Sequence, residues 1–233
     1  MRRFASLLAL WLLALTQPAL AEVISVRSWT DADGTEWTET VEEVTEEPGS
    51  ERFVAAPAVD VPAIAAFGPF RVIDPARAAL VGETDSLSPS DFQAMLRAYP
   101  GIAVLELVDC PGTLDDTANL RLGRMIRARG LATHVPADGS VRSGAVELFL
   151  AGAVRSAEPT AEFAVHSWLD TEGREAGDFS ADEPVNRTYL AYYREMGLTP
   201  DNAAAFYALT NSVPNETALW LRPADIARYA ALN

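Results

Sequence analysis

The chain has 233 residues, and its 33 acidic side chains outnumber its 18 basic ones, so that the formal net charge is −15 at pH 7. An acidic protein repels nucleic acids and anionic membranes, so neither is an expected partner. All the basic residues are arginine. The absence of lysine excludes a serine–lysine dyad, a Schiff base and a P-loop, and a serine nucleophile would need histidine or a weaker base.

The first 21 residues have the pattern of a bacterial signal peptide. Arg2 and Arg3 precede an apolar run over residues 7–15, and small residues at 19–21 form a cleavage site. The apolar run is shorter than the roughly 20 residues that a membrane-spanning helix needs. We therefore expect an exported protein, periplasmic or secreted, that meets the membrane only through the cleaved signal peptide.

Cysteine and histidine are scarce. Cys110 is the only cysteine, so the chain has no internal disulfide. It is expected to be a small buried hydrophobe, with pairing between chains as the alternative. The histidines, His134 and His166, are too few and too far apart in sequence to indicate a structural zinc site. No metal or cofactor is expected.

Residues 22–69 are expected to form an acidic N-terminal arm and linker. Asp33 and Gly34 favour a hairpin turn between Val23–Trp29 and Thr35–Val44, which predicts a small β-ribbon or a mobile arm. Residues 51–69 are rich in alanine, proline and valine, as is typical of a linker. The folded domain is therefore expected to span residues 70–233.

The next segment opens that domain. Phe70–Ile73 and Ala78–Val81 are predicted strands. Ser88 fits the N-cap of a helix and Pro89 its first position, and residues 100–101 (Pro-Gly) end it.

Residues 101–168 are the most informative part of the chain. The predicted order is a strand over 102–108, a turn over 110–113, a helix over 120–129, a strand over 131–135, a turn cluster over 138–144, and a helix over 145–152. Gly130 is expected to end the first helix. This βαβα layout predicts an α/β fold in which both turns lie at the carboxyl edge of a parallel sheet. Backbone amides at that edge can build an oxyanion site beside Ser143.

The C-terminal part begins with an acidic loop over residues 170–184, long enough to be a flap. Helices are predicted over 185–196 and from a Thr199 cap to about residue 209. A strand over 218–221 and a helix over 223–229 follow.

Several segments, in this order, resemble the Clp protease proteolytic-subunit and crotonase-like superfamily, and within it a group of exported bacterial proteins with a Clp-like domain. The matching segments are Leu80–Glu83, Cys110–Thr113, Leu122–Thr133, Ser143–Gly152, Phe163–His166 and Leu219–Tyr229. The resemblance implies a spiral of βαβ units over residues 70–233. It also implies assembly into rings or trimers, so a homo-oligomer is an expected state.

The resemblance also implies a catalytic site. Ser143 falls at the nucleophile position and His166 at the base position, while the amide of Gly144 and the turn of Gly112 and Thr113 would bind the oxyanion. Three departures weaken this reading. Thr113 replaces a glycine, Glu147 stands where the family has an apolar residue, and Ala218 replaces the aspartate that orients the histidine.

The third member of a triad is therefore not fixed by the sequence. Glu216 is taken as the predicted residue, with Asn215, Asp170 and Asp178 as alternatives.

Each candidate also has a purely structural interpretation. Ser143 could be the N-cap of the helix over 145–152, and His166 a satisfied core histidine. Glu147 is expected at an exposed helix position, His134 in a buried strand, and Tyr189 with Tyr193 in the core.

Two functions remain open. The first is an exported serine hydrolase acting on a peptide or protein, with Ser143 as nucleophile and His166 as base. The alternative is a catalytically silent Clp-like module that binds a peptide or protein partner in the same groove, and the three departures favour it. A crotonase acting on coenzyme A thioesters is disfavoured, because the expected export and the lack of lysine both oppose it.

Overall fold

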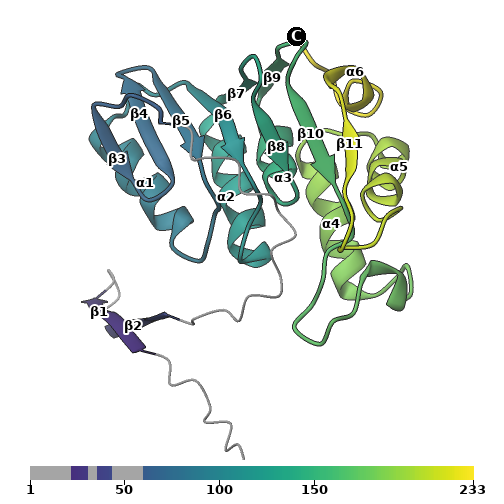
Figure 1. Cartoon of the computed structure of the whole chain (residues 1–233), viewed down its shortest axis with the longest axis horizontal. Helices are drawn as coiled ribbons and strands as arrows, with labels where there is room; N and C mark the ends of the chain where they lie inside the picture. Colours follow the sequence, from purple (N-terminus) through teal and green to yellow (C-terminus); the bar gives the residue numbers. More distant parts are fainter. Residues whose placement is uncertain (1–21, 31–35, 44–59) are drawn as a thin grey trace, which may run out of the picture. The chain divides into compact units, whose positions relative to one another are not determined.

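The structure is a computed structural model that describes residues 22–30, 36–43 and 60–233 (Figure 1). The predicted signal peptide, the Asp33–Gly34 turn and most of the predicted linker lie outside these residues. The chain divides into two units, Met1–Arg52 and Phe53–Asn233. In the first, β1 (Glu22–Thr30) pairs antiparallel with β2 (Glu36–Glu43), as the hairpin pattern predicts.

The second unit is a mixed α/β structure. Its strands are β3 (Ala65–Phe67), β4 (Phe70–Asp74), β5 (Arg77–Val81), β6 (Val104–Cys110), β7 (Ala132–Val135), β8 (Ser140–Arg142), β9 (Val154–Ala157), β10 (Glu162–Val165) and β11 (Leu219–Leu221). Its helices are α1 (Ser88–Ala98), α2 (Asp116–Arg129), α3 (Ala145–Leu150), α4 (Pro184–Glu195), α5 (Pro200–Thr210) and α6 (Pro223–Ile226), with a 3-10 turn, η1, over Ala176–Asp178. The predicted α/β class is confirmed.

The strands form one sheet in the order β11-β10-β8-β6-β5-β4-β3, with β7 and β9 branching from β6 (Figure 1). Neighbouring strands from β5 through β6 and β8 to β10 are parallel, whereas β3, β4 and β11 join antiparallel. The first half of β6 pairs with β7 and its end pairs with β8. The loops that follow β6, β8 and β10 therefore leave from the same edge of the sheet.

Two strands lie where the sequence predicts none. β3 is in the expected linker and pairs with β4 through a turn in which Gly68 has a positive φ of 51°. β8 lies inside the expected turn cluster. Its outer residues, Ser140 and Arg142, are polar but buried, because neighbouring side chains bind them. A buried polar strand has no hydrophobic pattern, which is why sequence periodicity misses it.

Helix boundaries follow local capping. α2 starts four residues before its predicted first residue, because the Asp115 side chain accepts a hydrogen bond from the Ala118 amide at 2.9 Å. Gly130 ends α2 in the left-handed conformation with φ 72°, as predicted. The Thr199 cap of α5 is also confirmed, since its hydroxyl accepts from the Asn202 amide at 3.2 Å.

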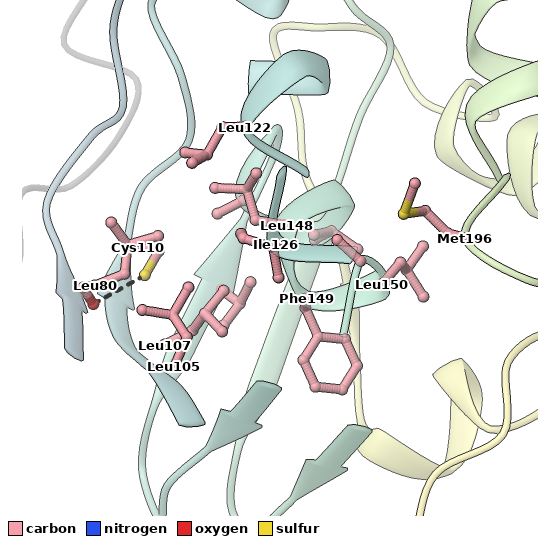
Figure 2. Packing of buried hydrophobic residues seen from close by; sticks show 14 of the residues in the cluster. Leu80, Leu105, Leu107, Cys110, Leu122, Ile126, Leu148, Phe149, Leu150 and Met196 are labelled. Atoms are coloured by element: carbon pink, nitrogen blue, oxygen red, sulfur yellow. Dashed lines mark hydrogen bonds between the residues drawn. The ribbon is translucent and has the colours of Figure 1, made fainter. Parts of the chain in front are cut away.

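The core lies between the parallel strands and the helices α2 and α3. Figure 2 shows Leu105 and Leu107 of β6, Ile126 of α2 and Phe149 of α3 in this cluster, and all are fully buried. Cys110 is buried among them, and its thiol donates to the Leu80 carbonyl at 3.3 Å. The expectation of a small buried cysteine is thus confirmed.

Membrane-spanning helices were sought in the described residues, and none of the helices there is both long and apolar enough to cross a bilayer.

Candidate active site

Ser143 lies in the turn between β8 and α3 and has an unusual backbone conformation. Its φ is 50°, a left-handed value that costs a residue other than glycine about 1–3 kcal/mol. Two hydrogen bonds hold it there, from the Ser143 amide to the Ala164 carbonyl at 2.8 Å and from the Val146 amide to the Ser143 carbonyl at 3.0 Å. A strained serine between a strand and a helix is how several hydrolases expose their nucleophile.

The capping interpretation of Ser143 finds no support in this geometry. The N-cap of α3 is Gly144, and no side chain caps the helix. Ser143 is half-buried, and its hydroxyl is left available for another role.

A buried ion pair fixes the strand that carries Ser143. Arg142 binds the Asp109 carboxylate of β6 at 2.8 Å and donates to the Ser140 hydroxyl at 2.6 Å. That hydroxyl donates to Glu162 of β10 at 3.1 Å. The network ties β8 to both neighbouring strands and so determines where the following turn lies.

Gly112 follows β6 and lies directly against Ser143. Its φ is 144°, and a Cβ placed on it would be 3.0 Å from the Ser143 Cβ and 3.4 Å from the Ser143 Oγ. A larger residue here would be strained and would crowd the hydroxyl. The predicted position of the Gly112 turn beside Ser143 therefore agrees with the structure.

Thr113 fits its position without strain. Among residues 60–233, only Asp138 and Ser143 combine a side chain with a positive φ. The Thr113 hydroxyl donates to the Thr84 carbonyl at 3.1 Å, and a Cβ on Gly144 would lie 2.6 Å from the Thr113 methyl carbon. The replacement of a glycine by Thr113 is thus accommodated by the absence of a side chain on Gly144.

The backbone amides of Thr113 and Gly144 lie on neighbouring residues in space, at the edge that also carries Ser143. In the described part of the chain, neither amide donates to another group. Two such donors beside a serine are the kind of arrangement that stabilises an oxyanion.

His166 directly follows β10, and its Nδ1 lies 2.8 Å from the Ser167 carbonyl oxygen. The Asn215 amide nitrogen is 3.1 Å from the same Nδ1 and 2.9 Å from that oxygen. A carbonyl oxygen so close to Nδ1 requires a hydrogen between them, so Nδ1 donates and Nε2 keeps its lone pair. This tautomer is the one a general base needs.

Asn215 is the residue whose side chain contacts the His166 ring. Glu216, its neighbour and the predicted third member, has an exposed side chain. Asp170 and Asp178 hydrogen-bond within their own loop, to the amides of Arg174 and Glu175. The predicted role of Glu216 stays a prediction.

Ser143 and His166 line the same cavity, whose volume is about 40 Å³. The other lining residues are Asp116, Gly144, Glu147, Val165, Trp168, Tyr189, Tyr193, Tyr207, Thr210 and Asn211. Glu216 is not among them.

Glu147 is buried, with 7% of its surface exposed, so the expectation of an exposed helix position is wrong. The Tyr193 hydroxyl donates to its carboxyl at 2.6 Å, and the Tyr192 hydroxyl donates to its backbone carbonyl at 2.8 Å. Burial raises the pKa of Glu147 from 4.5 to about 7. Glu147 is one helical turn beyond Ser143 on a face that α4 covers, and this tertiary contact has no signature in the local sequence.

Asp116, the first residue of α2, is a lining residue that the sequence analysis missed. The residue as a whole is exposed, which places its carboxyl at the solvent side of the cavity. Its pKa is raised by burial of the carboxyl, although the Tyr189 hydroxyl and attraction to His166 lower it. The available signal was the pair of aspartates at the start of the helix after the Gly112 turn.

Aromatic rings form much of the cavity wall. Tyr189 stacks on Trp168 and Tyr207, with ring centroids 6.4 and 5.7 Å apart. The Trp168 indole donates to the Tyr207 hydroxyl at 2.8 Å. Tyr189 and Tyr193 are buried, as core residues were predicted to be, and they also line the cavity.

His134 takes no part in this site. It is half-buried on β7, and its Nδ1 lies 2.9 Å from the Ser156 hydroxyl. Within the described ranges, no group of three or more histidine, cysteine, aspartate or glutamate residues could hold a metal ion.

Comparison with known proteins gives likenesses of structure alone. No family model and no curated protein matches the sequence. The structure is similar to a mutant 1510-N membrane-bound stomatin-specific protease in complex with a substrate peptide, with 14% identity, a TM-score of 0.46, and coverage of 68% of this chain and 72% of that one.

Two further solved structures are similar to the same extent. ClpP1 from Listeria monocytogenes has 16% identity and a TM-score of 0.46, over 69% of this chain and 90% of that one. The ClpP catalytic domain from Plasmodium falciparum has 11% identity and a TM-score of 0.46, over 66% and 81%. The functional proposal below rests on the geometry of this chain itself.

Proposed function

We propose that the protein is a serine hydrolase that cleaves a peptide by acyl transfer. The observation that carries the proposal is Ser143, held at a strained φ in one cavity with His166. Strain of this kind persists where the surrounding structure fixes it, and here the hydroxyl is used for no cap. The resemblance of the ordered sequence motifs to Clp peptidases points to the same chemistry.

In the proposed reaction, the Ser143 Oγ attacks the substrate carbonyl carbon while the His166 Nε2 takes its proton. The Gly144 and Thr113 amides stabilise the oxyanion that forms. His166 then gives the proton to the leaving amine, and water hydrolyses the acyl-enzyme by the same route. Each oxyanion donor is expected to contribute about 3 kcal/mol.

Asn215 is the proposed positioning residue of this site. Its amide donates to the Ser167 carbonyl, which accepts from His166 Nδ1. It therefore supports the ring orientation without adding the negative charge that an aspartate would supply. We expect a slower hydrolase than one with a complete triad.

The test is labelling by a fluorophosphonate, which reacts only with an activated serine. The wild-type protein should be labelled, Ser143→Ala should not, and Ser90→Ala, which removes an exposed serine on α1, should match the wild type. A folded wild type that resists labelling would contradict the proposal and favour the peptide-binding module. Export, a peptide substrate and a homo-oligomeric state remain proposals that purified mature protein can test in turn.

A further inference from the structure

The cavity beside Ser143 has an unbalanced charge. The carboxyl groups of Asp116 and Glu147 line it, and no arginine does among the residues that the structure describes. Within residues 60–233, Glu147 also forms no ion pair elsewhere. Burying a carboxylate without a cation costs several kcal/mol. Retaining one in this position is unfavourable unless a ligand brings the missing charge.

A third acceptor in the wall is independent of these acids. Asn211 lines the same cavity, and its Oδ1 is buried without a hydrogen-bond partner in the described part of the chain. The amide orientation is fixed, because Nδ2 donates to the Tyr207 carbonyl at 2.7 Å and would be replaced by a repelling oxygen if flipped. A buried acceptor of this kind calls for a ligand that donates a hydrogen bond.

The size and the walls of the cavity restrict the donor. A volume of about 40 Å³ accommodates an ammonium group better than a planar guanidinium with its five N–H donors. The walls carry Trp168, Tyr189 and Tyr207, and aromatic rings attract cations to their faces. The three acceptors also match the three donors of a primary ammonium group.

We propose that this cavity binds a primary ammonium group of the peptide substrate, held by Glu147, Asp116 and the Asn211 carbonyl beside the bond that Ser143 attacks. This inference rests on the proposed hydrolase function. Glu147 and Asp116 are then the residues that determine substrate specificity. The ammonium can come from a lysine side chain or from the free N-terminus of the peptide.

Matched 4-nitrophenyl esters separate these sources. Nα-acetyl-lysine ester offers only the side-chain ammonium, norleucine ester only the N-terminal one, and Nα-acetyl-norleucine ester neither. One of the two ammonium-bearing esters should have a kcat/KM about 10- to 100-fold above that of the acetyl-norleucine ester, as expected for charge-assisted hydrogen bonds. Equal kcat/KM for all three esters in a protein that fluorophosphonate labels would overturn this inference and leave the hydrolase proposal intact.

Variants assign the preference to the cavity. Glu147→Gln should reduce the kcat/KM ratio to about 1, mainly through KM, while fluorophosphonate labelling persists. Asp116→Asn, which removes the carboxyl at the solvent side, should reduce the ratio in part and serves if the first variant fails to fold. Glu158→Gln changes an exposed acid outside the lining and should keep the wild-type ratio. A ratio unchanged in both cavity variants would contradict the assignment.

A binding experiment covers the case in which the protein is not a hydrolase. Calorimetry should detect binding of n-butylammonium to the wild type, with weaker binding to Glu147→Gln and none of 1-butanol. If fluorophosphonate labelling fails while this binding is present, the hydrolase proposal is wrong and the ammonium site belongs to a binding module. Absence of n-butylammonium binding, or equal binding of both compounds, would overturn the site itself.

Discussion

Two neighbouring parts of helix α3 face very different surroundings. Leu148 and Phe149 lie in the aliphatic and aromatic core drawn in Figure 2, where no charged group is among the labelled side chains. Glu147, one residue earlier, is equally enclosed but lies against tyrosines of α4 and lines the cavity of Ser143. The first part contributes to stability through burial of apolar surface. The second places a carboxyl group where burial opposes its charge.

This difference indicates that the face of α3 toward α4 serves binding rather than folding. A helix selected only for stability would carry an apolar residue at position 147. The tyrosines of α4 support this division, since Tyr192 and Tyr193 spend their hydroxyl groups on Glu147. Variants on the two faces should therefore have opposite effects on the free energy of unfolding.

The largest expected effect is on the core face. Phe149→Ala should lower the free energy of unfolding by about 3–5 kcal/mol, because Phe149 is fully buried and packs on Phe163 with ring centroids 4.9 Å apart. Urea denaturation measures the change. Phe149→Leu keeps most of the volume and should cost much less. A loss below about 1 kcal/mol for the alanine variant would contradict the assignment of this face to the core.

Glu147→Gln should act in the other direction. The carboxyl group has a pKa of about 7 in the folded protein and 4.5 as its ordinary value, so the folded state holds the proton more tightly. This group therefore lowers stability progressively as pH rises from 4.5 to 7. Above pH 7, the glutamine variant should be more stable by up to about 3 kcal/mol, with no gain at pH 4.

Urea denaturation at the two pH values tests this. The groups facing Glu147 are Tyr192 and Tyr193 of α4, Tyr207 of α5 and Asp116 of α2, together with His166 of the same cavity. His166→Gln in the Glu147→Gln background separates titration of the histidine from that of the acid. A glutamine variant less stable than wild type at pH 8 would show that the carboxylate is stabilised where it lies.

Asn215 should matter for chemistry and little for stability. Asn215→Ala should slow fluorophosphonate labelling by roughly 10- to 100-fold, less than the 10⁴-fold effect of removing a charged orienting residue. Asn215→Asp should restore labelling and alter its pH profile, because a carboxylate favours the protonated ring. Glu216→Gln is the decisive comparison. If this variant loses labelling while Asn215→Ala keeps it, the sequence-based choice of Glu216 is correct.

The smallest effect concerns Cys110. Burial raises the pKa of its thiol above the ordinary value, so the thiolate is scarce and the sulfur is enclosed. A coloured thiol reagent should react only after unfolding in urea, and Cys110→Ala should leave Ser143 labelling unchanged. Rapid reaction of the native protein would show that the core around β6 opens readily.

Sequence reasoning succeeded where local chemistry decides structure. Gly130 and Thr199 mark helix ends through backbone and capping preferences that need no tertiary context. Ser143 and His166 were found because the order of motifs resembles a known family. Their arrival in one cavity then follows from parallel strands that end at a common edge.

It failed where distant contacts decide. The burial of Ser140 and Arg142 depends on Asp109 and Glu162, which are far away in the sequence. Glu147 looks like a solvated helix residue until α4 is placed over it. The choice between Asn215 and its neighbour depends on side-chain direction in a loop, which no periodic pattern encodes.

The most direct measurement is the position of the fluorophosphonate adduct in the wild-type protein. Cleavage after arginine releases residues 143–155, a peptide in which Ser143 is the only serine. Mass spectrometry should find the adduct on this peptide, and the His166→Ala variant should lose it while remaining folded. An adduct on another serine, or an unchanged yield without His166, would contradict the claim that this histidine activates Ser143.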